Sequence, residues 1–404
     1  MLKARSQAAV PEAPKPLMTD VIAGDGAALS EELLAMRKAL FPPVSKKTLR
    51  SFSSVESAKL IGIGDAYLRQ LSLGGKGPQP EIGSGGRRWY SLDQINQIRA
   101  VLDENSKSKN YVHRRRPGEH CQVMAVVNFK GGSGKTTTAA HLAQYLALQG
   151  YRVLGVDLDP QASMTALHGY QPEYDIQANE TMYAAIRYDD KRRPLSEIIK
   201  PTYFTGLDLI PGNLELMEYE HDTPRALAER STEPFFGRVA SALGSVEARY
   251  DVIVIDCPPQ LGFLTLGALC ASTGLLITAH PQMLDVMSMC QFLLMTSDLL
   301  SVVQDAGGDL DYDFIRYVVT RYEPSDGPQA QMVGFMRSLF RERVLTNTML
   351  KSTAISDAGL SKQTLYEVGR ENFARSTYDR AIESLDAVNG EIESLMKQAW
   401  GRAS

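Results

Sequence analysis

The chain has 404 residues, 44% of them hydrophobic, and a formal net charge of −4, so it can bury a sizeable core. Its charge is uneven, because residues 1–120 carry 19 Lys and Arg against 12 Asp and Glu, while the rest of the chain carries 24 against 35. A basic front end on an acidic body suggests a nucleic-acid-binding head, although a solvated basic surface gives the same count. Cys121, Cys257, Cys270 and Cys290 show no CxxC spacing, so neither a zinc site nor a disulfide framework is expected.

The first residues, Met-Leu-Lys-Ala-Arg followed by a tract rich in Pro and Ala, do not resemble a signal peptide. No apolar run is expected to approach the roughly 18–20 residues that span a bilayer. We therefore expect a cytoplasmic protein that has no membrane partner.

Residues 1–45 are expected to hold a mobile arm and one helix. Residues 1–29 are rich in Ala, Pro and Gly and show no period, which predicts the arm. Ser30 is expected to begin an amphipathic helix that ends at Pro42-Pro43. A lone helix cannot bury its apolar face within itself, so it packs on the next domain or on a second copy, and we predict a dimerisation helix.

Residues 46–117 are predicted to form a small DNA-binding domain and a linker. One helical pattern ends at Gly62-Ile63-Gly64 and a second begins at Asp65, which is a helix-turn-helix pattern. The Gly-rich loop before Trp89 predicts the wing of a winged helix-turn-helix, and Ser91 is expected to cap a third helix. This segment resembles the small DNA-binding domains of the MerR type.

The second helix of this motif would face base edges, while the wing and its approach would hold phosphates. The predicted DNA-binding residues are Tyr67, Arg69 and Gln70 for bases and Lys76, Arg87 and Arg88 for phosphates. Helix-turn-helix units also occur as plain packing motifs, but the local positive charge favours DNA binding. The basic linker over 104–118 either touches the DNA backbone through Arg114–Arg116 or is a solvated hinge.

Residues 118–404 are predicted to form an α/β domain with a mostly parallel sheet and flanking helices. The predicted strands are 123–127, 153–156, 207–210, 252–255, 274–278 and 314–320. Their near-continuous apolar runs suit strands that are covered on both faces. Because ligands bind beyond the carboxyl ends of such strands, Asp157, Asp159 and Asp256 should converge on one site. The last helix, over 376–400, is expected to pack or to dimerise.

A Gly-rich stretch after the first of these strands is expected to bind nucleotide phosphates. It reads Lys130, Gly131, Gly132, Ser133, Gly134, Lys135, Thr136 and Thr137, and it opens a helix. Its glycines let the backbone N–H groups turn inward around phosphates. Lys135 is placed for the β- and γ-phosphates and the Thr136 hydroxyl for Mg²⁺. The strict P-loop pattern has glycine where this chain has Phe129, and the loop carries Lys130 beside it.

Two aspartates complete the expected site. Asp256 ends the run Val-Ile-Val-Ile-Asp, which is the Walker B pattern, and it is expected to hold Mg²⁺ through water. Asp159 is the candidate acceptor for the attacking water. Either aspartate alone could be a strand-end cap, but the P-loop favours the functional interpretation.

Three motifs together resemble the deviant Walker A ATPases of the ParA/MinD/nitrogenase-iron-protein superfamily: Lys-Gly-Gly-Ser-Gly-Lys-Thr-Thr, Asp-Leu-Asp-Pro-Gln and Ile-Asp-Cys-Pro-Pro. The Asp-Pro-Gln favours the ParA branch, and the N-terminal winged segment makes the chain similar to plasmid partition ATPases, above all the RepA proteins of repABC replicons. The resemblance implies that Lys130 reaches the phosphates of a partner across a nucleotide-sandwich dimer. It implies that Asp159 is the hydrolytic aspartate and Asp256 the switch II aspartate.

The resemblance further implies a homodimer that binds ATP or ADP with Mg²⁺ and associates with the nucleoid. It would bind DNA non-specifically through basic residues late in the ATPase domain, where Lys351 is the nearest match and Arg337, Arg341 and Arg343 are neighbours. Relatives often carry a second arginine after that lysine, whereas this chain has Ser352-Thr353-Ala354, so the set of DNA contacts stays open. A centromere-binding ParB-type partner, RepB in repABC replicons, would stimulate weak ATPase activity.

Three other interpretations account for part of the sequence. The chain could be a DNA-binding repressor whose nucleotide site only senses, with no transport role. A metal-cluster reductase would need cysteines that bridge two subunits, and the cysteines here lie in apolar strand and helix contexts. A MinD-like membrane ATPase is disfavoured because the C-terminal helix is acidic rather than basic.

Overall fold

The computed structural model describes residues 18–40, 47–106, 110–229, 233–308 and 310–402. The chain divides into two compact units, Met1–Lys47 and Thr48–Ser404. The first unit holds helix α1 (Met18–Leu40), which begins twelve residues before the predicted start at Ser30. The expectation of a mobile arm is therefore wrong for residues 18–29, because the alanines of this stretch favour a helix. Residues 1–17 and Pro42-Pro43 lie outside the described residues, and dimerisation through α1 stays a prediction.

The second unit begins with a helix-turn-helix followed by a β-hairpin, as the sequence predicts. Its elements are β1 (Phe52–Ser53), α2 (Ser54–Ile61), α3 (Asp65–Leu73), β2 (Glu81–Ile82), η1 (Ser84–Gly86), β3 (Arg88–Tyr90) and α4 (Leu92–Glu104). The first helix ends at Gly62, whose φ of 76° favours glycine. The third begins with a capping box in which Ser91 and Gln94 satisfy each other's backbone N–H groups. Strands β2 and β3 pair antiparallel, in the position where the sequence predicts the wing.

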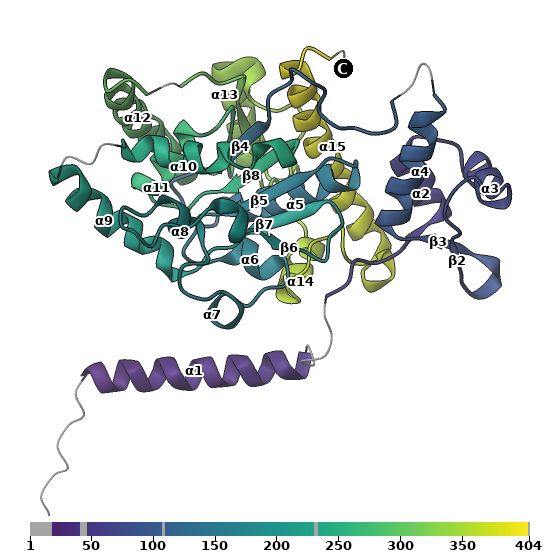
Figure 1. Ribbon diagram of the computed structural model, residues 1–404, viewed down its shortest axis with the longest axis horizontal. Helices are drawn as coiled ribbons and strands as arrows, with labels where there is room; N and C mark the ends of the chain where they lie inside the picture. The colour runs from purple at the N-terminus through teal and green to yellow at the C-terminus, as the bar shows by residue number, and fades with distance from the viewer. Residues whose placement is uncertain (1–17, 41–46, 107–109, 230–232, 309, 403–404) are drawn as a thin grey trace, which may run out of the picture. The chain divides into compact units, whose positions relative to one another are not determined.

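The α/β domain contains a seven-stranded sheet in the order β10-β9-β4-β8-β5-β7-β6 (Figure 1). The strands are β4 (Gln122–Val127), β5 (Val153–Asp157), β6 (Lys200–Pro201), β7 (Leu207–Ile210), β8 (Val252–Asp256), β9 (Gly274–Ala279) and β10 (Phe314–Val319). Among the described pairs of this sheet, the edge pair β6–β7 is antiparallel and the other neighbours run parallel. The predicted strands and the parallel sheet are confirmed, with ends that differ by one residue at most.

Helices cover both faces of this sheet. They are α5 (Lys135–Leu148), α6 (Ser163–Leu167), α7 (Pro172–Asp175), α8 (Met182–Ile186), α9 (Met217–Ala228), α10 (Phe235–Gly244), α11 (Phe263–Cys270), α12 (Met283–Asp305), α13 (Gly327–Phe340), α14 (Thr353–Leu360) and α15 (Arg375–Ala399). Short 3₁₀ turns are η2 (Leu195–Glu197), η3 (Leu214–Leu216), η4 (Glu247–Arg249), η5 (Arg341–Arg343) and η6 (Arg370–Asn372). The C-terminal helix α15 packs against α5 and buries Ala381, Leu385, Val388 and Ile392, which confirms the packing role.

A buried arginine joins the winged segment to the α/β domain. Arg99 of α4 is 1% exposed, and its Nη2 donates to the carbonyl oxygens of Leu60 at 2.6 Å and Leu148 at 2.7 Å. Burial lowers the pKa of Arg99 to about 10, so the guanidinium still carries its charge at neutral pH. Leu148 is the last residue of α5, where a cation satisfies an otherwise unpaired carbonyl and favours the helix dipole.

The linker is fastened to the α/β domain over its described part, residues 110–118. The backbone N–H of Arg115 donates to Asp251 Oδ1 at 3.1 Å, and its Nη2 donates to the Glu247 carbonyl at 2.7 Å. The solvated-hinge interpretation is therefore wrong for this stretch, because these contacts fix it. Arg114 and Arg116 are exposed, and DNA contact through them stays a prediction.

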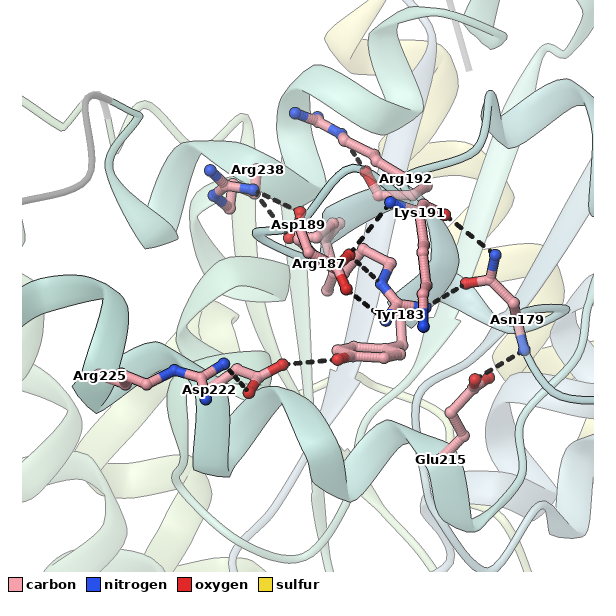
Figure 2. A network of polar contacts seen from close by, with 12 residues as sticks. Asn179, Tyr183, Arg187, Asp189, Lys191, Arg192, Glu215, Asp222, Arg225 and Arg238 are labelled. Atoms are coloured by element: carbon pink, nitrogen blue, oxygen red, sulfur yellow. Dashed lines mark hydrogen bonds and ion pairs between the residues drawn. The ribbon is translucent and has the colours of Figure 1, made fainter. Parts of the chain in front are cut away.

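A polar network braces the segment after α8, as Figure 2 shows. Arg187 donates to Asn179 Oδ1 at 2.8 Å, and the Tyr183 hydroxyl donates to Asp222 Oδ2 of α9 at 2.5 Å. Arg238 of α10 donates to the Arg187 carbonyl at 2.9 Å. These side chains hold the long segment between β5 and β7 in place, and no sequence motif predicted their contacts.

Helix α12 exposes much of its apolar surface. Met283, Leu284 and Met287 are more than half exposed, and an apolar groove lies between α12 and α13. Among the described residues, α12 alone is long and apolar enough by length and composition to cross a membrane. Its apolar sequence is interrupted by polar residues, among them Asp285 and Asp298, so it is not a continuous apolar run. Helices of water-soluble domains pass the same length and composition test, and Asp285 in its first turn is tied to the P-loop.

Candidate nucleotide-binding site and DNA-binding surface

The functional residues converge because three site strands are neighbours. Strand β8 lies between β4 and β5, and Asp256 is in register with Val126 on one side and with Asp157 on the other. The loop after β4 and the aspartates that end β5 and β8 therefore share one edge of the sheet, as predicted. A cavity of about 620 Å³ opens at this edge. Its lining includes Gly131, Gly132, Gly134, Lys135, Thr136, Thr137, Asp159, Arg321 and Lys351.

The P-loop adopts a conformation that requires its glycines. Gly132 has a φ of 75°, and Gly134, which precedes the first residue of α5, has a φ of 91°. A Cβ on Gly134 would also lie 3.3 Å from the Cβ of Thr320. The Thr320 hydroxyl donates to the Ser133 carbonyl at 2.7 Å, so the loop after β10 supports the P-loop from behind.

Lys135 is held inside the loop that it belongs to. Its Nζ donates to the Lys130 carbonyl at 3.2 Å, and the residue is only 6% exposed. Burial lowers the pKa of Lys135, while the carboxylates of Asp256 and Asp159 raise it. A desolvated ammonium in this position is suited to a polyanionic ligand, because the ligand would supply the negative charge that balances it.

Asp256 has the properties of a metal-facing carboxylate. It is fully buried, and neither of its oxygens accepts a hydrogen bond from a described residue. The Thr136 hydroxyl favours the charged form without completing a hydrogen bond to either oxygen. Burial and the neighbouring Asp157 raise the pKa of Asp256 well above its usual value. A buried carboxylate without donors fits Mg²⁺, which takes oxygen ligands and keeps much of its water.

Asp157 and Asp159 have different environments although they are two residues apart. Asp157 is buried, and its Oδ2 accepts from both the N–H and the hydroxyl of Thr165 at 2.7 Å. Burial raises the pKa of Asp157 to about 7. Asp159 is half-buried and lines the cavity, and its Oδ1 accepts from the Gln161 N–H at 2.9 Å. Asp157 therefore stabilises the loop that follows β5, and Asp159 is the carboxylate that faces the cavity.

Asp285 and Arg321 contact the P-loop, although no motif in the sequence identified them as site residues. Lys130 Nζ donates to Asp285 Oδ2 of α12 at 2.6 Å, and Arg321 Nη1 donates to the Gly132 carbonyl at 3.1 Å. Arg321 has a φ of 53°, which is uncommon for a residue with a side chain. Their positions after β9 and β10 were the one available signal, because β9 lies beside β4 and β10 lies beside β9 in the sheet.

The predicted DNA-contact residues of the winged segment lie largely in solvent. Tyr67 is 45% exposed, Arg69, Gln70, Lys76 and Arg87 are exposed, and Arg88 is half-buried. Lys351 has a different setting, because it pairs with Glu323 at 2.8 Å and lines the nucleotide cavity. Its role in non-specific DNA binding stays a prediction.

A Gly-rich loop between a central parallel strand and a helix, with aspartates ending the adjacent strands, defines a P-loop NTPase of the deviant Walker A type. A family model described as "AAA domain" matches residues 121–305. A protein of Sinorhizobium fredii (strain NBRC 101917 / NGR234), provisionally named replication protein A, is 57% identical over 388 residues, which are 95% of each chain. SopA of Escherichia coli (strain K12) is 30% identical over 368 residues, which are 89% of this chain and 92% of SopA.

A solved structure titled "Partition Protein" has the same fold, with a TM-score of 0.64 over 92% of this chain and 98% of that one, at 19% identity. That likeness shows the fold, and the relatives at 57% and 30% identity show the family: the chain belongs to the ParA family of partition ATPases, in its plasmid-type branch.

Proposed function

We propose that this ATPase is a switch for plasmid segregation: ATP drives a homodimer that binds DNA non-specifically, and hydrolysis releases it. A ParB-type, RepB-like centromere-binding protein stimulates hydrolysis, and the winged segment binds the operator of the protein's own promoter. The protein is then cytoplasmic and associated with the nucleoid. The observation that carries the proposal is that Lys135, Asp159 and the P-loop glycines line one cavity.

The site residues have distinct roles in this proposal. Lys135 and the loop N–H groups neutralise the transferred phosphoryl group, and Asp159 orients the attacking water. Thr136 and Asp256 would hold Mg²⁺, which neutralises phosphate charge when it is bound. Lys130 contributes to the site of a second copy.

The proposal is tested by measuring molecular mass and DNA binding without nucleotide, with ADP and with ATP. A dimer that binds random-sequence DNA should form with ATP and Mg²⁺ and be absent with ADP. The same monomeric mass under all three conditions would refute the switch.

A second candidate is a repressor whose nucleotide site only senses, and the exposed residues of the winged segment favour it. Steady-state ATP hydrolysis with DNA and with the ParB-type partner separates the two. Stimulation supports the switch, and a rate that stays unchanged under every condition supports the sensor.

Asp159→Ala should bind ATP and DNA like the unchanged protein but hydrolyse ATP at least 100-fold more slowly, because the attacking water loses its acceptor. Single-turnover hydrolysis and nucleotide titration measure the two properties. Glu323→Ala, which removes a partly exposed carboxylate that pairs with Lys351, is the matched control. Normal turnover in Asp159→Ala would assign the role to another residue.

Arg87→Ala combined with Arg88→Ala should weaken operator binding and reduce the slope of log affinity against log salt by about 1–2, since two phosphate contacts are lost. Footprinting over a salt series measures both. Arg225→Ala, an exposed arginine of α9 far along the chain, should leave the slope unchanged. An unaltered footprint in the double variant would show that the wing does not contact DNA.

A further inference from the structure

The pairing of Lys130 with Asp285 is a feature that the proposed function does not use. The Nζ–Oδ2 distance is 2.6 Å, with the lysine side chain 39% exposed and the carboxylate side chain 9% exposed. The backbone of Lys130 is held on both sides, because its N–H donates to Asn128 Oδ1 at 2.8 Å and its carbonyl accepts from Lys135. We therefore expect the side chain of Lys130 to move while its backbone stays in place.

Asp285 depends on Lys130 for its charge balance. It lies in the first turn of α12, where the helix dipole favours a carboxylate. Its other ionisable neighbour within 4 Å among the described residues is His280, whose Nδ1 lies 3.8 Å from Oδ1. Burial lowers the pKa of His280, so the ring is neutral at physiological pH. Losing Lys130 would thus leave a largely buried carboxylate without a cationic partner.

We propose that Asp285 is a positioning residue that holds Lys130 within its own chain until an ATP-bound second copy competes for the ammonium. This inference rests on the proposed function, because the pairing matters for the switch only if Lys130 crosses to a second copy. One ammonium cannot fully neutralise a buried carboxylate and a phosphate of another chain together. Dimer formation must therefore break the Lys130–Asp285 contact, and leaving Asp285 unpaired lowers the affinity of the dimer.

Asp285→Asn tests this inference, since it keeps the shape of the side chain and removes its charge. The ATP-dependent dimer should become tighter by about tenfold, a typical size for a coupling between sites. Sedimentation over a concentration series with a non-hydrolysable ATP analogue measures the dimer, and nucleotide titration of dilute protein should show an unchanged affinity. Asp298→Asn is the matched control, because it removes an exposed carboxylate from the same helix.

The double variant Lys130→Ala with Asp285→Asn completes the test. It should dimerise as weakly as Lys130→Ala alone, because the gain requires the lysine. An Asp285→Asn dimer that is equal to or weaker than the unchanged one would overturn the inference. If the unchanged protein forms no ATP-dependent dimer, or if Lys130→Ala has no effect on it, the proposed function itself fails.

Discussion

Replacing Lys135 by alanine should lower the affinity for ATP by roughly 100-fold or more, which is the loss expected when a desolvated, charge-assisted phosphate contact disappears. Lys135 is only 6% exposed. Burial disfavours this cation, as its lowered pKa indicates, so removing it should not destabilise the fold. The unfolding temperature without nucleotide should thus be unchanged or higher.

Nucleotide titration by calorimetry, together with the shift in unfolding temperature on adding ATP, measures this loss. Lys351→Ala is the matched control, because Lys351 lines the same cavity from the rim and pairs with Glu323. It should retain most of the affinity. Retained affinity in Lys135→Ala would contradict the assignment of the P-loop.

Gly131→Val should permit ATP binding and abolish the ATP-dependent dimer. The affinity of one subunit for the other should fall at least about 100-fold. Within a single chain, a Cβ on Gly131 would meet no atom within 4 Å, and its φ is not in the left-handed region. A larger side chain is therefore compatible with the isolated subunit. If two P-loops face each other in the dimer, the valine instead occupies the space of the partner's loop.

Gly132→Val is the matched contrast one residue further along. Gly132 has a φ of 75°, which strains any branched side chain, so this variant should lose ATP binding in the single chain. Sedimentation with and without an ATP analogue, paired with nucleotide titration, separates the two effects. An intact ATP-dependent dimer of Gly131→Val would show that the loops of two copies do not meet.

Much of the site was predictable because its signals are local. The strand–loop–helix pattern fixed the place of Lys135, and the apolar runs that end in Asp157 and Asp256 fixed those carboxylates at strand ends. In the winged segment, the end of α2 and the start of α4 followed from turn and capping chemistry at Gly62 and Ser91. These patterns span a few residues, so they can be read without knowing how the chain packs.

The sequence by itself determined the P-loop, the parallel sheet and the convergence of the aspartates on one edge. Only the tertiary structure decided which side chains surround them. Lys130 contacts Asp285, which lies 155 positions away, and Arg321 contacts Gly132, which lies 189 positions away. Arg99 contacts Leu148, which lies 49 positions away. Such contacts depend on strand order and helix packing, which place β9 beside β4 and β10 beside β9. No periodicity along the chain encodes that proximity, because it arises only when the sheet has assembled.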